Sequence, residues 1–172
     1  DISENAKITE IGMYAFAYSG ITSLAVTDDL TTMGTYVFYR SKLQSFTWPK
    51  TITTIPNYTF AECAELTSFN FGESAVVAIA DHAFHGCTAL TSFTFPETLK
   101  SLGSFAFAYC EKISSFDFGS KSKIATIGDS CFSSTGITEF AFPVVHDDEG
   151  KIIPFATLGS SLLSGCDKLE TV

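Results

Sequence analysis

Hydrophobic and polar residues alternate in one short stretch that recurs along the chain. Its clearest form is two phenylalanines separated by one residue, as at Phe69-Phe71, Phe93-Phe95, Phe116-Phe118 and Phe140-Phe142. Phe46-Thr47-Trp48 and Leu24-Ala25-Val26 occupy the same place earlier. Successive side chains of a β-strand point to opposite faces, so this F-x-F alternation predicts a short strand with both rings inward. We predict parallel strands over residues 21–26, 43–48, 66–71, 90–95, 113–118, 137–142 and 169–172.

Each predicted strand belongs to a longer unit with the frame I-G-x-x-A-F-x-x-C-x-x-L-x-x-F-x-F-P. Apolar residues three apart before the central phenylalanine, such as Ile52 and Ile55, predict a second, shorter extended piece. The A-F-x-x-C segment is too short for a full helix and predicts a single 3₁₀ or α turn. Successive central positions lie 22, 22, 24, 23, 25 and 31 residues apart, and a period in the low twenties is typical of leucine-rich repeats. These positions are Phe16, Phe38, Phe60, Phe84, Phe107, Phe132 and Leu163.

The repeating unit predicts a single solenoid domain over residues 1–172. The expected fold class is an α/β-type solenoid, a right-handed leucine-rich-repeat superhelix of about seven coils. A parallel β-sheet is expected on its concave face, with short strands and turns on the convex face. The rings should line up in inner columns, because no unit can bury its apolar side alone. The expected repeats are 8–29, 30–51, 52–75, 76–98, 99–123, 124–152 with an insertion at 144–151, and a partial repeat at 153–172.

Both ends of the chain are expected to continue into further sequence. Few residues precede Ile8, and Val172 falls inside a predicted strand. Open sheet edges pair readily with other strands. We therefore expect a monomer that can associate end to end, cut from a longer protein with more repeats or another domain.

Composition and charge narrow the classes of partner. The 172 residues include 19 acidic and 10 basic ones, for a net charge of −9, which disfavours binding to nucleic acid or anionic lipid. Hydrophobic residues make up 45% of the chain, enough for a continuous core. No run of about 18 apolar residues occurs, so membrane insertion is not expected.

The outward residues of the predicted strands are the expected ligand-binding face of such an array. Most are small, neutral and rich in hydroxyl groups, without the aromatic and arginine anchors that dominate protein interfaces. Each contact should therefore be weak, and strength should come from avidity across many repeats. The candidate binding residues are Ser45, Thr47, Ser68, Asn70, Ser92, Thr94, Ser115, Asp117 and Glu139.

The cysteines follow the repeat instead of a disulfide framework. Four of them lie three residues after a central position and Cys131 lies just before one. Such periodic placement indicates buried, free thiols in the role of small apolar residues. A bridge between Cys63 and Cys87 remains the alternative, since adjacent coils come within bridging distance. No CxxC or HxxxH spacing supports zinc, and no metal or other cofactor is expected.

Three further features have a functional and a structural interpretation. His82 and His85 are either a metal pair or, as we favour, outward substitutions at variable positions. The insertion carries Asp147, Asp148 and Glu149 without the spacing of a calcium loop, so a solvated hairpin tip is favoured over a calcium site. One column of aromatic residues either seals the outer wall of the core, as we favour, or forms a binding stripe for a sugar or peptide. It comprises Tyr14, Tyr36, Tyr58, His82 and Phe105.

The repeats resemble a known family. The segments I-G-M-Y-A-F-A-Y-S, I-A-D-H-A-F-H-G-C-T-A-L-T-S-F-T-F-P and L-G-S-F-A-F-A-Y-C are similar to the BspA-like leucine-rich repeats of the Treponema type. That family occurs on surface proteins of host-associated bacteria and some parasitic protists. The resemblance runs from Ile8 to Val172 apart from the insertion, with phenylalanine replacing isoleucine in the strands and Leu163 replacing the last central phenylalanine. It implies a cell-surface or secreted protein that adheres to host or bacterial partners and has no shared active site.

The sequence therefore predicts a non-catalytic adhesion module that recognises extracellular proteins or glycans through weak, repeated contacts. The alternative is a structural stalk that carries other domains and has no ligand of its own. An enzyme is not expected, because the chain lacks a nucleophile–base pair, a glycine-rich phosphate loop and a spaced metal triad.

Overall fold

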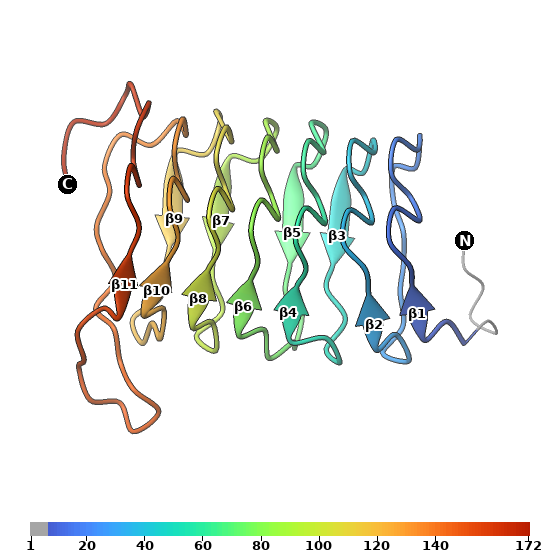
Figure 1. Cartoon of the computed structure of the whole chain (residues 1–172), viewed down its shortest axis with the longest axis horizontal. Coiled ribbons are helices and arrows are strands. Elements are labelled where there is room, and N and C mark those ends of the chain that lie inside the picture. Colours follow the sequence, from blue (N-terminus) through green and yellow to red (C-terminus); the bar gives the residue numbers. More distant parts are fainter. Residues whose placement is uncertain (1–6) are drawn as a thin grey trace.

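The computed structural model describes residues 7–172 as a stack of coils that runs from β1 at one end to β11 near the other (Figure 1). Each coil places a two-residue strand on one side, and four coils also carry a three-residue strand on the other side. The described residues form no helix, and so none that could cross a lipid bilayer. The two-residue strands are β1 (Glu10–Ile11), β2 (Thr32–Met33), β4 (Thr54–Ile55), β6 (Ala78–Ile79), β8 (Ser101–Leu102), β10 (Thr126–Ile127) and β11 (Thr157–Leu158). The three-residue strands are β3 (Ser45–Thr47), β5 (Ser68–Asn70), β7 (Ser92–Thr94) and β9 (Ser115–Asp117).

The fold class is confirmed as a parallel β-solenoid, with two corrections to the expected detail. The α/β character is absent from the described residues, which contain strands and turns alone. The largest sheet joins five coils in the order β4-β6-β8-β10-β11, while β1 and β2 form a separate pair, so the sheet is shorter than the about seven coils expected. This sheet is built from the second extended pieces, which were expected to be the minor strands.

Alternation explains why these short strands form. In β4 the hydroxyl-bearing Thr54 is exposed and Ile55 is fully buried, and the register places Ile79 and then Leu102 beside it in the next coils. β-branched and leucine side chains of similar size thus stack in a column on the core side, and threonine or serine faces out.

The F-x-F strands are shorter and less continuous than predicted. β3 pairs with β5 and β7 pairs with β9, but the described residues contain no backbone hydrogen bond between β5 and β7. The predicted strand at 21–26 is absent, where Leu24 and Val26 replace aromatic residues and are only partly buried. The predicted strands at 137–142 and 169–172 are reduced to one bridge between Glu139 and Thr171. The rings in this layer are large enough to fill the core while the backbones of some neighbouring coils stay apart.

The segment around each central residue was expected to be one 3₁₀ or α turn, and this was wrong. It forms two successive turns, closed in the third coil by bonds from the N–H of Ala61 to the carbonyl of Tyr58 and from the N–H of Cys63 to the carbonyl of Phe60. Tyr58 and Glu62 have φ values of 59° and 58°, in the left-handed region that non-glycine residues rarely adopt. A ladder to the next coil holds this conformation, with N–H donation from Phe60 to the carbonyl of Ala83 at 2.8 Å and from Glu62 to that of His85 at 2.6 Å.

A glycine often begins this double turn because neighbouring coils come into close contact there. A Cβ added to Gly128 would lie 2.4 Å from the backbone nitrogen of Ser104. Such an overlap forces a backbone shift, so a side chain at this position would separate two coils.

The core is centred on the central phenylalanines. Successive rings stack from Phe38 to Phe60, Phe84 and Phe107 with centroids 5.2–5.3 Å apart, and all of these side chains are fully buried. The expected columns of F-x-F rings are only partly realised. Phe46, Phe69 and Phe93 stack at 6.5 and 5.8 Å, and Phe95 stacks on Phe116 and Phe118. Other contacts in this layer, such as those of Phe71 with Phe93 and of Phe118 with Phe140, are edge to face. Offset and edge-to-face geometries are the favoured ones for aromatic pairs.

Candidate functional site

The outward residues of the F-x-F strands form the candidate binding face. The register places Ser45 beside Ser68 and Thr47 beside Asn70. It also places Ser92 beside Ser115 and Thr94 beside Asp117. All nine predicted site residues, Glu139 included, are exposed in the structure. The outward orientation predicted for them is therefore confirmed, while their role in binding remains a prediction.

The structure divides these residues into three groups instead of one continuous surface. One group lies on β3 and β5 and a second on β7 and β9. The third is Glu139, which bridges to Thr171. Within the described residues no backbone hydrogen bond joins β5 to β7, or β9 to residues 137–142. A ligand therefore meets paired strands separated by breaks in the sheet.

Two of the predicted site residues also shape the backbone. The Oδ1 atom of Asn70 accepts a hydrogen bond from the N–H of Gly72 at 2.8 Å, and Oδ1 of Asp117 accepts one from the N–H of Gly119 at 2.9 Å. Gly72 has a φ of 58°, which glycine adopts without strain. These are Asx turns, and the spacing Asn/Asp-x-Gly is a sequence signal that would have revealed them.

Two grooves lie on the candidate face, and each is found where neighbouring coils are not paired as strands. The C-terminal groove runs between β9 and residues 139–142, has a volume of about 570 Å³ and is lined by Ser115, Asp117 and Glu139 among others. The N-terminal groove, of about 370 Å³, lies between residues 23–26 and β3 and is lined by Ser45, Thr47 and Trp48 among others. The sequence indicated the outward residues but not the grooves, because strand pairing was assumed to be uniform.

The insertion forms a hairpin that folds back on earlier coils. His146 and Ile152 are bridged antiparallel, and Oδ1 of Asp147 accepts hydrogen bonds from the N–H groups of Glu149 and Lys151, at 3.0 and 2.8 Å. The predicted hairpin tip is confirmed. The Asp147 carboxylate serves its own turn, and the described residues contain no group of three or more potential metal ligands.

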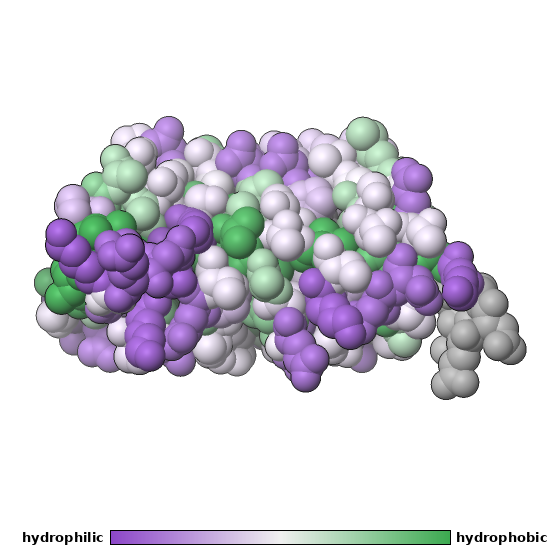
Figure 2. All heavy atoms as spheres, turned by 90° about the horizontal axis from the view of Figure 1, so that it is seen from below, coloured by the Kyte–Doolittle hydropathy of each residue, from purple (hydrophilic) through white to green (hydrophobic). Residues whose placement is uncertain are grey.

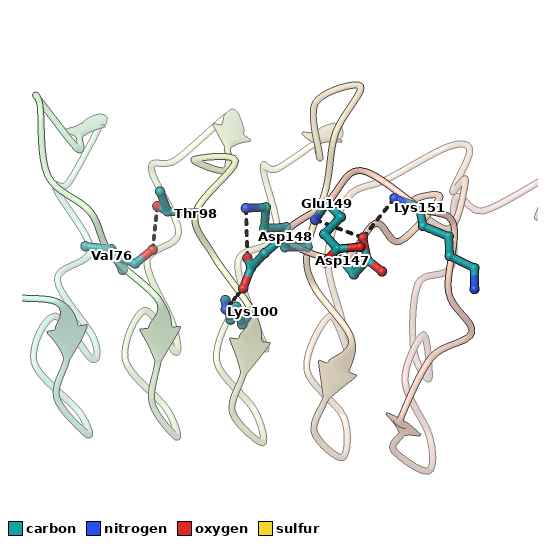
Figure 3. Close-up of polar contacts among 8 residues, drawn as sticks. Val76, Thr98, Lys100, Asp147, Asp148, Glu149 and Lys151 are labelled. Carbon is teal, nitrogen blue, oxygen red and sulfur yellow. Dashed lines mark hydrogen bonds and ion pairs between the residues drawn. The ribbon is translucent and has the colours of Figure 1, made fainter.

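Asp148 joins the hairpin to the residues just before β8 and β10. Its carboxylate oxygens lie 3.2 Å from Nζ of Lys100 and 3.0 Å from Nζ of Lys123 (Figure 3). Hydrogen bonds from Lys123 and Lys100 lower the pKa of the Asp148 carboxyl. Viewed from below, hydrophilic side chains are crowded at this C-terminal end of the molecule (Figure 2). The hairpin thus adds charged groups beside Lys100 and Lys123, next to β8 and β10.

The aromatic column forms a continuous ladder along the turns. Tyr14, Tyr36, Tyr58, His82 and Phe105 stack with centroids 4.4–4.9 Å apart and planes within 20° of parallel. The ring faces cover one another, so they are not free to stack on a sugar. This geometry favours the structural interpretation over a binding stripe.

The two histidines are part of the same aromatic wall. Burial, followed by the neighbouring His85, lowers the pKa of His82, and burial lowers that of His85. Their rings lie 5.5 Å apart by centroid, and Nδ1 of His82 is buried without a hydrogen-bond partner in the part of the chain that the structure describes. A neutral ring that stacks between Tyr58 and Phe105 is the state that this geometry supports.

The prediction of buried, free thiols is confirmed for all five cysteines. Four thiols donate to the carbonyl of the central phenylalanine one coil earlier, as Cys63 does to Phe38 at 2.9 Å and Cys110 to Phe84 at 3.1 Å. Burial raises the pKa of Cys63 to about 11 and that of Cys110 to about 12. Protonated thiols are poor nucleophiles, so Cys63 and Cys110 have a structural role.

Solved structures share this architecture. A leucine-rich cell surface protein from Faecalibacterium prausnitzii A2-165 is 26% identical, with a TM-score of 0.79 over 95% of this chain and 42% of its own. A leucine-rich repeat protein from Bacteroides ovatus ATCC 8483 is 21% identical, with a TM-score of 0.78 over 95% of this chain and 46% of its own. The pneumococcal vaccine antigen PcpA is 24% identical, with a TM-score of 0.64 over 92% and 34%. The last two show likeness of fold alone.

This chain spans less than half the length of these three structures. None of the curated protein sequences is similar enough to the chain to count as a match. The family model for the BspA type leucine rich repeat region matches residues 1–78 and 66–172 and finds six copies of the repeat. The chain is a leucine-rich repeat protein related to bacterial surface proteins, and it belongs to the BspA type leucine-rich repeat family.

Proposed function

We propose that this chain is a non-catalytic binding module of a cell-surface or secreted protein, which recognises an extracellular protein or glycan through the outward face of the F-x-F strands. One observation carries the proposal. The two grooves described above open on this face, and their lining includes five of the nine predicted site residues: Ser45, Thr47, Ser115, Asp117 and Glu139. The description of the Faecalibacterium relative as a cell surface protein supports the location.

The character of the face supports weak, repeated contacts over one tight site. Its outward residues are serine, threonine, asparagine and two acids, all exposed, and none of them is a tryptophan, tyrosine or arginine, the types that dominate interface hot spots. The strands of one pair present equivalent residues side by side, as Ser92 and Ser115 do. Binding at several such places together would supply the strength that one place lacks.

A stalk without its own ligand is the second candidate, and the continuous core supports it. The central rings stack without interruption from Phe16 to Phe132, which is the construction of a stiff spacer.

An array of glycans and immobilised matrix proteins separates the two candidates. The variant Ser68→Arg/Ser92→Arg/Ser115→Arg adds bulk and charge to the candidate face, and Thr32→Arg/Thr54→Arg/Thr157→Arg makes the same change at exposed positions of the two-residue strands. Binding that the first variant loses and the second keeps supports the binding module. Binding lost equally in both, or no binding by the unaltered chain across the array, contradicts it and favours the stalk.

A further inference from the structure

The C-terminal groove opens at a break where β9 and the extended residues 139–142 face each other without backbone pairing. β9 pairs with β7 on one side, and on the far side Phe140 donates its N–H to the carbonyl of Thr171 at 3.0 Å. Between β9 and residues 139–142 the described residues form no backbone hydrogen bond. An unpaired strand edge in a groove is a template for a further strand.

The shape of the groove suits an extended chain. The rings of Phe116, Phe118 and Phe140 line it from the core side, and Phe142, which is 40% exposed, adds an apolar wall. The lining from Ser115 to Gly119 corresponds to roughly 13 Å of extended backbone, about four peptide residues. Alternate side chains of such a peptide would face the rings and the solvent in turn.

The charge of the groove favours basic residues among the peptide side chains that face the solvent. Asp117 and Glu139 are exposed on its outward side, and no lysine or arginine lines it. The ion pairs among the described residues lie elsewhere, on Glu62, Asp28 and Asp148. Within the described residues the two carboxylates therefore form no ion pair, and they attract a cationic partner.

We propose that the C-terminal groove binds an extended segment of a partner protein in which apolar and basic residues alternate, and that this segment adds as a strand between β9 and residues 139–142. The apolar side chains cover Phe116 and Phe140, and the basic ones lie against Asp117 and Glu139. The inference names the partner class and site of the proposed function, and so depends on it.

A synthetic peptide tests this directly. The probe is acetyl-Lys-Val-Lys-Val-Lys-Val-amide, with the glutamate analogue and an analogue N-methylated at alternate residues as controls. Titration followed by NMR should shift the amides of residues 115–119 and 139–142 with the lysine peptide alone. Their hydrogen exchange should slow as strand bonds form. Binding should weaken several-fold between about 0.1 M and about 1 M salt, since exposed charges are screened.

Variants locate the contacts. Asp117→Asn/Glu139→Gln removes both charges, keeps the turn at Gly119 as Asn70 does at Gly72, and should weaken binding about five- to tenfold. Glu111→Gln/Asp167→Asn makes the same change in net charge at exposed positions outside the groove and should leave binding unchanged. Equal binding of the lysine, glutamate and N-methylated peptides, or no binding, would overturn the proposal.

Two outcomes separate this inference from the proposed function. If the chain binds the array but not the lysine peptide, the groove assignment is refuted and the proposed function stands. Ser68→Arg/Ser92→Arg changes the face outside the groove lining, so it should reduce array binding and leave peptide binding intact. Concentration-dependent self-association that Ala141→Arg abolishes would make a second copy the occupant and overturn the peptide assignment.

Discussion

The thiol of Cys87 donates a hydrogen bond to the carbonyl oxygen of Phe60, 3.2 Å away and one coil earlier. The same bond recurs between Cys63 and Phe38 and between Cys110 and Phe84, so each thiol ties a coil to the one before it. Polar Ser41 is buried at the equivalent place in an earlier coil, where its hydroxyl lies 3.5 Å from the thiol of Cys63. The position selects a small side chain with a donor.

Removing the thiol of Cys87 should lower the stability of the fold, and a hydroxyl in its place should restore part of the loss. Cys87→Ala should lower the free energy of unfolding by about 1–2 kcal/mol, since it leaves a buried carbonyl without this donor and vacates the sulfur's volume. Cys87→Ser keeps a hydrogen-bond donor, so its free energy of unfolding should fall less. Urea denaturation of both variants measures the difference. Serine proving worse than alanine would show that packing alone fixes this position.

The central ring column predicts a large loss of stability when one of its rings is truncated. Phe84 is fully buried and stacks at 5.2 Å on both Phe60 and Phe107, so Phe84→Ala should cost about 3–5 kcal/mol in denaturant unfolding. Phe142→Ala is the matched control, because this ring is 40% exposed and should cost roughly 1 kcal/mol. Equal losses at the two positions would refute the column as the centre of the core.

The left-handed turns predict an unusual preference for glycine over a β-branched residue. Ser134 has a φ of 55°, and Gly86 and Gly165 occupy the same place in other coils. Ser134→Gly should therefore be more stable than Ser134→Val by about 1–3 kcal/mol in thermal or denaturant unfolding. At the exposed strand residue Ser92 the order should reverse, because valine suits a strand. The same order at both sites would contradict the turn geometry.

The ladder that contains His82 predicts a pH dependence. Burial and the neighbouring His85 lower the pKa of His82 below its ordinary 6.5, against a weaker opposing effect of Asp81. The folded state then binds fewer protons than the unfolded one, so this contribution is complete above pH 6.5 and is lost as pH falls through the lowered pKa. The free energy of unfolding, measured by calorimetry or urea denaturation, should therefore decrease as the pH is lowered below 6.5.

A variant isolates the contribution of His82. In His82→Phe a phenyl ring takes the position that Phe105 has in the next coil. The free energy of unfolding should then depend less steeply on pH below 6.5, and His85 should account for the dependence that remains. Carboxylates with lowered pKa values, Asp28 and Glu62 among them, lose their contribution only in a more acidic window, below about 4.5. An unchanged slope in His82→Phe would refute the role assigned to this ring.

The solenoid, its repeat and the direction of the outward residues could be predicted from the sequence. Phenylalanines such as Phe69, Phe93 and Phe116 recur at regular intervals, and their alternation with polar residues indicates which side chains are buried. It did not predict the double turns, because tyrosine and glutamate at positions such as Tyr58 and Glu62 rarely adopt a positive φ. Bonds to the neighbouring coil impose that conformation, and such bonds are invisible in one repeat taken alone.

The sequence pattern also could not predict where neighbouring F-x-F strands are unpaired. Phe69 and Phe93 stack across an unpaired boundary just as Phe46 and Phe69 stack across a paired one. Ring contacts therefore do not report whether the backbones pair. The grooves follow from this backbone detail, so the candidate residues could be predicted and their grouping could not.

Amide hydrogen exchange of the intact chain tests the stacking of coils most directly. The N–H groups of Phe38, Phe60, Phe84, Phe107 and Phe132 each donate to a carbonyl in the following coil. Residue-resolved NMR or mass spectrometry should find these amides slow to exchange, recurring with the length of the repeat. Rapid exchange at these amides, with protection confined to one or two segments, would contradict the solenoid and the binding face built on it.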